Sequence, residues 1–393
     1  MRPARRSAWV AAAATLAALT WQVATVHFNY RGNWTALFCI GEKSPMPAEL
    51  ESGSWIFPAS NGYDGQYYRI VAHDPWMQTG LPQFVDGRLR YQRILLPAAA
   101  WLLAFGQPGW IDRSYILLVL LSVFAGTWFT AMWAAIQNRA VWWGIGFLFL
   151  PGVLITLNRM TVDITEYAFM AAVLYFWRRG FWLGCWIAGA SAFLTRDLGL
   201  ILIAALVGMC LLQRSWRRAA MFATAALPAV LWILYVNHAL VSHSITQSES
   251  IALIPTWVFN SPLIGPFLAM IHPQNYPLGV WMKTATQLLD DISIAGVTLS
   301  ACVAAAEVRR RPFTLESFLC VLYAALFVMA SSRGFWADPY SYPRAFSPLV
   351  GLIAWRSVTG SRAWPSIPWL CLLSRVGWQL GPQAISIIRA VVE

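Results

Sequence analysis

The chain has 393 residues, of which 58% are hydrophobic and 11% are charged. Soluble domains carry roughly a quarter charged residues, so the composition excludes an ordinary soluble domain and indicates a protein that crosses a membrane several times. The net charge of +11 does not indicate nucleic-acid binding, because the arginines form short clusters between apolar runs, as in cytoplasmic loops. These clusters are Arg2/Arg5/Arg6, Arg178/Arg179, Arg214/Arg217/Arg218 and Arg309/Arg310/Arg311.

Apolar runs recur along the whole chain and predict an all-α polytopic membrane fold of about 11 transmembrane helices. The first run follows a basic start, and we expect an uncleaved first helix with its N-terminus in the cytoplasm. No internal repeat or linker divides the chain, which predicts a single membrane domain over 1–393. The expected spans are 8–27, 114–136, 141–157, 162–177, 181–195, 198–213, 219–237, 284–306, 313–331, 345–358 and 365–381.

The apolar run 94–106 is too short to cross the membrane. It would make about 20 Å of helix, against a hydrocarbon core of about 30 Å. If this run does not cross, every arginine cluster falls on the cytoplasmic side, whereas a crossing would place two clusters outside. We therefore expect a re-entrant or surface-lying helix here, within one long first extracytoplasmic loop over 28–113.

The same topology gathers most of the remaining charged residues on the outer side. Further outer segments are expected at 158–161, 195–197, 238–283 and 332–344. Charges at the edge of the hydrocarbon layer are costly unless water or an opposite charge satisfies them. We therefore expect an outer cavity with a shared charged lining, formed by Asp64, Arg93, Asp163 and Arg196.

The segment NGYDGQYYRIVAHDP, residues 61–75, is polar and aromatic in an otherwise apolar chain. A helix beginning near its start would place Asp64, Tyr67 and Tyr68 on one face. A carboxylate beside aromatic rings suits a sugar, since the acid accepts a hydroxyl proton and the rings pack on the sugar. The alternative is structural: Asp64 caps a surface helix whose tyrosines lie at the lipid interface.

Arginines of the outer loops form a candidate phosphate site. Arg90 and Arg93 are three residues apart and can point together at a phosphate, which a guanidinium binds through two hydrogen bonds. Alternatively, they extend toward lipid headgroups. Arg333 and Arg344 lie in a late outer loop that suits either an anionic headgroup or an ordinary interfacial position.

Two more outer segments carry charges at the ends of expected spans. Asp163 and Glu166 open a span, and Arg159 can join them in a local charge network, although the helix dipole alone favours acids in a first turn. Arg196 and Asp197 lie at the tip of a tight turn, where the acid could simply cap the next helix. The histidines and cysteines show no metal-ligand spacing, so no metal site is expected from them.

Together these motifs resemble the GT-C superfamily of membrane glycosyltransferases, which use polyprenyl-phosphate sugars. The resemblance covers about the first 240 residues well and the rest loosely. Within the superfamily, the motifs are similar to those of a bacterial branch linked to cell-surface glycopolymers. It implies an enzyme of the bacterial inner membrane with an extracytoplasmic active site. The motifs are YDGQYYRIV (63–71), RYQRILLP (90–97), D-x-T-E (163–166) and LTRDLGL (194–200).

The resemblance also implies roles for individual residues. Asp64 matches the catalytic or acceptor-binding carboxylate of the first loop, and Asp163, with Glu166 beside it, matches the acid that opens a later helix. Gly65 stands where the family has a second acid, which leaves the need for a divalent metal open. Tyr67 and Tyr68 are expected to pack on the sugar. The expected ligands of the donor phosphate are Arg90, Arg93, Arg196, Arg333 and Arg344.

The expected function is therefore inverting transfer of a sugar from a polyprenyl-phosphate donor to a lipid-linked or polymeric glycan, with Asp64 as the base. Membrane lipid is a further expected partner, and nucleic acid is not. A transporter or flippase of lipid-linked sugar would use the same arginines, but it would usually show duplicated halves and broken helices, and neither is evident in the sequence. A non-catalytic assembly subunit of the same fold would tolerate the replacement of Asp64.

Overall fold

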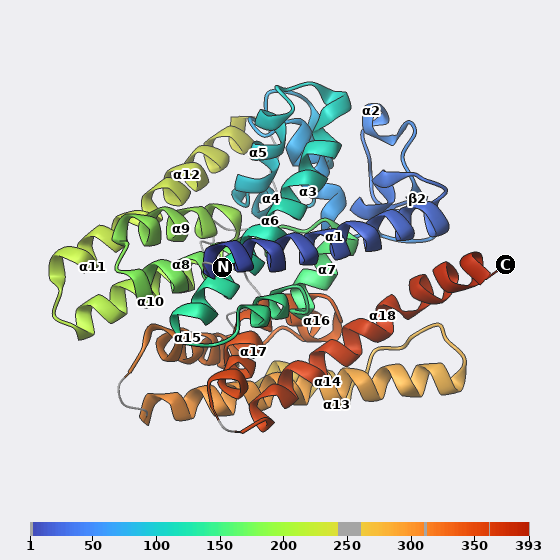
Figure 1. Ribbon diagram of the computed structural model, residues 1–393. Coiled ribbons are helices and arrows are strands. Elements are labelled where there is room, and N and C mark those ends of the chain that lie inside the picture. Colours follow the sequence, from blue (N-terminus) through green and yellow to red (C-terminus); the bar gives the residue numbers. More distant parts are fainter. Residues whose placement is uncertain (1–2, 243–260, 310–312, 361, 393) are drawn as a thin grey trace.

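The fold is helical, and this confirms the all-α class (Figure 1). Two short strands, β1 (Ile40–Gly41) and β2 (Ile56–Phe57), pair in parallel with Ile40 opposite Ile56. Of the expected outer loop 238–283, residues 243–260 lie outside the described part, as do Arg2, Arg310 and Arg311 of the arginine clusters. The computed structural model describes residues 3–242, 261–309, 313–360 and 362–392.

Short elements follow the first helix, α1 (Pro3–Tyr30), and make up the expected first loop. They include 3-10 helices, which are labelled η. In chain order they are η1 (Trp34–Phe38), α2 (Ala48–Glu51), α3 (Asp64–His73), η2 (Leu81–Phe84), α4 (Arg88–Gln92) and α5 (Leu95–Leu103).

Longer helices make up most of the remaining chain. The middle part contains α6 (Pro108–Ile136), η3 (Val141–Phe147), α7 (Pro151–Arg159), α8 (Asp163–Arg179), α9 (Trp182–Thr195), α10 (Gly199–Leu212), α11 (Trp216–Ala223), η4 (Thr224–Ala226) and α12 (Leu227–Ser242). The last part contains α13 (Ile264–Ile271), α14 (Val280–Ala306), η6 (Glu307–Arg309), α15 (Leu315–Met329), α16 (Arg333–Ala337), α17 (Ser341–Thr359), η7 (Trp364–Ser366) and α18 (Ile367–Val392).

Four helical segments in the described residues are long and apolar enough to cross a membrane, or five if η3 and α7 form one bent span. Three further apolar helices, α9, α10 and α15, are shorter. The protein is therefore a membrane protein, and the full set of expected spans stays a prediction. The four long segments are Pro3–Tyr30, Pro108–Ile136, Trp216–Leu240 and Val280–Arg309.

The expected span 141–157 is not one straight helix. η3 ends at Phe147, α7 begins at Pro151, and the two segments are bent by 55°. Proline disfavours the helical conformation in the residue before it, and Leu150 is extended with a ψ of 132°. The expected span is therefore broken, and the dipeptide Pro151–Gly152 is the local signal that explains the break.

The short run near the end of the first loop forms α5, which has nine residues and is therefore about 14 Å long. It packs against α3, α6 and α9. After a left-handed turn at Phe105 and Gly106, α6 begins at Pro108, earlier than the expected start at residue 114. The chain thus reverses within a few residues after α5, and a helix of this length alone does not reach across the hydrocarbon core.

The topology expected from the sequence predicts that the turn between α5 and α6 is extracytoplasmic. In a variant without native cysteines, Gln107→Cys should react with a membrane-impermeant maleimide added outside. Asn138→Cys, just beyond the other end of α6, should react only after the cytoplasmic side is opened. Labelling of the Gln107 variant from the cytoplasmic side alone would overturn the topology and the common outer face that depends on it.

The core forms around α6, which packs against α1 and α8 near the middle of the molecule (Figure 1). One buried cluster joins these helices through Ala18, Val119 and Ile164. Another joins α8, α9 and α10 to α15 and α17, with Leu206, Leu319 and Phe346 among its members. The first turns of α8 and α17 meet inside the bundle, where Arg344 of α17 pairs with Asp163 of α8.

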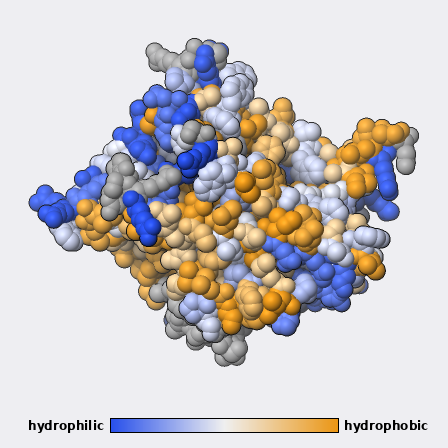
Figure 2. Space-filling view, turned by 90° about the horizontal axis from the view of Figure 1, so that it is seen from below, coloured by the Kyte–Doolittle hydropathy of each residue, from blue (hydrophilic) through white to orange (hydrophobic). Residues whose placement is uncertain are grey.

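Hydrophobic side chains also cover much of the outer surface, as expected for helices in contact with lipid. Figure 2 shows such residues spread over the side where α14, α15 and α18 lie in Figure 1. Leu288 of α14, for example, is 58% exposed.

Candidate functional site

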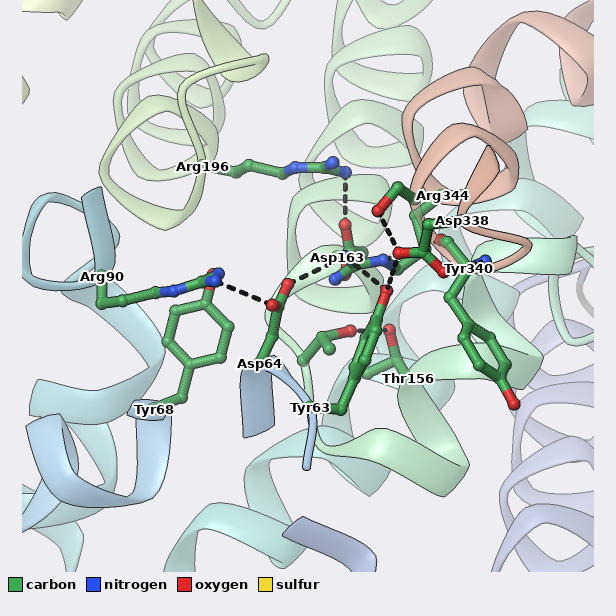
Figure 3. Close-up of polar contacts among 12 residues, drawn as sticks. Tyr63, Asp64, Tyr68, Arg90, Thr156, Asp163, Arg196, Asp338, Tyr340 and Arg344 are labelled. Carbon is green, nitrogen blue, oxygen red and sulfur yellow. Dashed lines mark hydrogen bonds and ion pairs between the residues drawn. The ribbon is translucent and has the colours of Figure 1, made fainter. Parts of the chain in front are cut away.

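Asp64 does not act as the cap of its helix. It is the first residue of α3, and Tyr63 precedes it as the N-cap without a side-chain capping hydrogen bond. The Asp64 carboxylate instead pairs with two arginines: Arg90 Nη2 lies 2.8 Å from Oδ1, and Arg344 Nη2 lies 2.8 Å from Oδ2. Figure 3 shows the two guanidiniums approaching it from different elements, α4 and α17. The structural alternative for Asp64 as a helix cap is therefore wrong.

Gly65, the residue directly after Asp64, has no space for a side chain. A Cβ at Gly65 would lie 2.1 Å from the carbonyl oxygen of Arg159 and 2.9 Å from that of Phe38. The backbone of α3 therefore packs directly against two other segments, and this close approach requires glycine. A second carboxylate at this position would have no room.

A continuous row of ion pairs extends from Asp64 into the protein interior. Arg344 bridges two acids, because its Nη1 also lies 3.2 Å from Asp163 Oδ2. Asp163 pairs in turn with Arg196, whose Nη1 is 3.5 Å from Glu166 Oε2. The structure thus brings together residues of the first loop, α8, the turn after α9, and α17.

Arg93 joins the same region through Asp197, the neighbour of Arg196. Its Nε lies 2.9 Å from Asp197 Oδ1, and its Nη1 donates to the Tyr68 hydroxyl at 2.9 Å. We define the charge cluster as the eight residues of these pairs, which are four acids and four arginines. They are Asp64, Asp163, Glu166, Asp197, Arg90, Arg93, Arg196 and Arg344.

The two tyrosines expected to pack on a sugar, Tyr67 and Tyr68, differ in their exposure. Tyr68 is fully buried, and the guanidinium of Arg90 lies 5.6 Å from its ring centroid. Tyr67 is only half-buried and lies 5.4 Å from the same guanidinium. Tyr68 therefore supports the arginines and offers no open ring face to a sugar, whereas Tyr67 keeps an exposed part.

Exposure increases along the charge cluster toward the first loop. The Asp163 side chain is 1% exposed, whereas those of Asp64 and Arg90 are 15% and 14% exposed. Burial acts to raise the pKa of Asp64, but the neighbouring Arg90 and Arg344 outweigh it and hold this pKa well below its usual range. Asp64 is therefore ionised at neutral pH, and it is the most exposed acid of the charge cluster.

Arg159 does not form the expected network with Asp163 and Glu166. α7 ends at Arg159, and Met160 adopts a left-handed conformation with φ 44°. The four-residue spacing therefore does not lie on one helix, and the Arg159 side chain points elsewhere. It donates to the Tyr340 hydroxyl at 2.8 Å and to Cys39 Sγ at 2.5 Å.

Arg333 also lies apart from the charge cluster. Its side chain is exposed and donates to the carbonyl of His272 at 3.2 Å. Arg333 and Arg344 were grouped because both lie in one loop region, but Arg333 begins the separate helix α16, whereas Arg344 lies in the first turn of α17. The structure therefore brings together four of the five arginines assigned to the donor phosphate.

Sequence reasoning missed the polar residues that position Arg344. Its Nη2 donates to the Tyr63 hydroxyl at 2.9 Å, and its Nε donates to the Tyr340 carbonyl at 3.0 Å. The Tyr63 hydroxyl donates to Asp338 at 3.2 Å. Tyr63 stands directly before Asp64, which is the only local signal, and nothing near Asp338 indicates that it would contact the first loop.

The expected charged lining is held together by direct ion pairs. Asp64, Arg93, Asp163 and Arg196 all belong to the charge cluster, where opposite charges satisfy them. The outer cavity that they were expected to line stays a prediction. No group of three metal-ligating side chains occurs among the described residues. The acids of the charge cluster face arginines, so a divalent metal could approach only in competition with these cations.

The chain matches no protein-family model, and no curated protein or solved structure is significantly similar to it. The geometry of the charge cluster and the motifs of the sequence therefore carry the functional argument.

Proposed function

We propose that the protein is an inverting glycosyltransferase that moves a sugar from a polyprenyl-phosphate donor to a lipid-linked or polymeric glycan on the extracytoplasmic side. The supporting observation is the meeting of Asp64, from the first loop, with Asp163, at the start of α8, through the single guanidinium of Arg344. Acids and arginines in one largely buried site suit a reaction that needs a proton acceptor and cations for a departing phosphate.

The proposed reaction is a single displacement. The oxygen of the acceptor hydroxyl bonds to the anomeric carbon of the donor sugar, while the bond between that carbon and the phosphate oxygen breaks. The hydroxyl proton passes to Asp64, and the lipid phosphate leaves with the bonding electron pair. Attack on the face opposite the leaving group inverts the configuration. A lipid phosphate is a good leaving group, so the base has to accept the proton only late in the reaction.

The ion pairs offer a way to couple donor binding to base strength. Arg90 holds Asp86 as well as Asp64, and Arg344 holds Asp163 as well as Asp64. A donor phosphate that replaced Asp64 on either arginine would release the carboxylate from a cation, and the pKa of Asp64 would rise toward its ordinary value. Asp64 would then be a stronger base when the donor is present than when it is absent.

The function is tested by incubating the purified protein with a panel of polyprenyl-phosphate sugars and a lipid-linked glycan, with and without a divalent-cation chelator. Release of polyprenyl phosphate together with an inverted glycosidic bond in the product is the expected result. A protein that turned over none of the panel but moved lipid-linked sugar between the leaflets of proteoliposomes would be a flippase, and the transferase proposal would fail.

A further inference from the structure

A cavity of about 540 Å³ lies between α6, η3, α8 and α17, in a part of the protein that the proposed reaction does not use. Its volume falls within the roughly 300–1,000 Å³ typical of sites for small molecules. Most of its lining is apolar, which suits a hydrocarbon chain. The lining includes Trp133, Phe147, Leu150, Met170, Leu174 and Pro348.

The cavity has one closed and one exposed end. Tyr167 and Ser347 are fully buried at one end, where the Tyr167 hydroxyl donates to the carbonyl of Arg344. The exposed lining residues are Trp143, Gly360, Arg362 and Ala363. α17 extends between these ends, and the residues from Arg344 to Thr359 span about 23 Å of helix. The mouth is therefore near the opposite end of α17 from the charge cluster.

Two indole rings in the lining have hydrogen-bonding groups without partners. Trp133 and Trp355 are stacked with ring centroids 4.4 Å apart. The Nε1 atoms of both are buried and have no hydrogen-bond partner among the described residues, and Trp133 is only 4% exposed. A buried donor without an acceptor is costly, so this pair favours an occupant that carries an acceptor group beside its apolar part.

The mouth is basic. Arg362 lines it, and Arg139 lies close by because its Nη2 donates to the carbonyl of Thr359 at 2.6 Å. Both side chains are exposed. An exposed arginine beside an apolar cavity suits an anionic headgroup attached to a hydrocarbon chain, since basic residues next to a membrane attract anionic lipids.

We propose that this cavity binds an anionic glycerophospholipid, with an acyl chain inside it and the phosphate headgroup at Arg362. The ester oxygens of such a lipid are acceptors of the kind that the indole donors lack. The site is separate from the donor site of the proposed reaction, because its mouth opens at the other end of α17. By the expected topology, a lipid of the cytoplasmic leaflet would occupy it.

The test uses the full-length protein in nanodiscs with a phosphatidylglycerol that carries a diazirine in one acyl chain. After illumination, peptide mass spectrometry should find adducts on the cavity lining, and unlabelled phosphatidylglycerol should compete better than phosphatidylcholine with the same chains. Arg362→Gln should reduce this preference about fivefold, the effect of one basic residue near an anionic lipid. Arg389→Gln, which alters an exposed arginine near the C-terminus, should leave it unchanged.

Two variants fill the cavity and check that labelling depends on it. Ala354→Phe and Ala171→Phe add bulk to the lining and should each remove most cavity adducts. Ala17→Phe, on an exposed face of α1, should not. Thermal unfolding of each variant shows that it is folded. Labelling that persists in both filled variants, or equal competition by phosphatidylcholine, would overturn the proposal. Stronger competition by polyprenyl phosphate would reassign the cavity to the donor.

Discussion

Asp64→Asn is expected to lower the rate of sugar transfer by about 10²–10⁴-fold, the usual effect of losing a general base. Asparagine keeps the size of the side chain but cannot accept the hydroxyl proton. The rate is measured with purified protein, a polyprenyl-phosphate sugar and a glycan acceptor, and donor binding is measured separately. The expected variant binds the donor and turns it over very slowly.

The structure indicates that Asp64→Asn will still fold. Removing one partner of a buried ion pair is normally costly because it leaves a charge unpaired. Here both arginines keep another acid, since Arg90 retains Asp86 and Arg344 retains Asp163. We therefore expect the variant to insert and unfold at nearly the normal temperature, so that a loss of rate reflects chemistry.

Asp86→Asn is the matched control for this substitution. Asp86 pairs with the same arginine, at 2.8 Å, but it is more exposed and lies outside the row of pairs that leads to Asp163. Its replacement should change the transfer rate only a few-fold, in line with the small energies of partly exposed ion pairs, about 0–1 kcal/mol.

Near-normal transfer by Asp64→Asn would contradict the catalytic role of Asp64. The same result is expected if the protein is a non-catalytic assembly subunit.

Arg344→Gln is expected to have the second large effect, because this residue contacts both Asp64 and Asp163. If Arg344 stabilises the departing phosphate, its loss should lower the transfer rate by about 10²–10³-fold, as does the loss of one charge-stabilising donor at other active sites. It should also destabilise the protein by about 3 kcal/mol, since two buried acids lose a shared partner. Transfer assays and thermal unfolding in detergent measure the two effects.

The stability effect has to be separated from the catalytic one. Arg344→Lys keeps the charge but cannot bind two groups in the same fixed plane. We therefore expect it to restore much of the stability and little of the rate. Arg333→Gln is the control from the neighbouring helix, where the side chain contacts only a backbone carbonyl among the described residues, and it should behave as the normal protein. Equal losses in Arg333→Gln and Arg344→Gln would contradict the assignment.

The sequence predicted the helical class and most of the charged residues that meet. Hydropathy locates apolar helices because lipid and a packed interior both require apolar side chains. The requirement that buried charges be satisfied then indicated that Asp64, Arg93, Asp163 and Arg196 belong together. What it could not predict was the pairing, because Asp64 and Arg344 are 280 residues apart and no local pattern relates them.

Errors arose where backbone breaks changed local spacing. Arg159 and Asp163 have the spacing of helical neighbours, but the turn at Met160 places them on different helices. The bend before Pro151 likewise divided an apolar run that hydropathy alone cannot divide. In both places a turn of a few residues decided the direction of the side chains.

The long separation between the partners in the charge cluster also determines when the cluster can form during synthesis. Arg90 follows Asp64, and Arg196 follows Asp163, within one or two helices of the chain, so each acid can be paired with an arginine early in synthesis, and this pairing lowers the cost of its charge. Arg344 is made much later, and it pairs with both acids. A nascent chain that stops before α17 would therefore hold these ion pairs separately, and translation of α17 would join them.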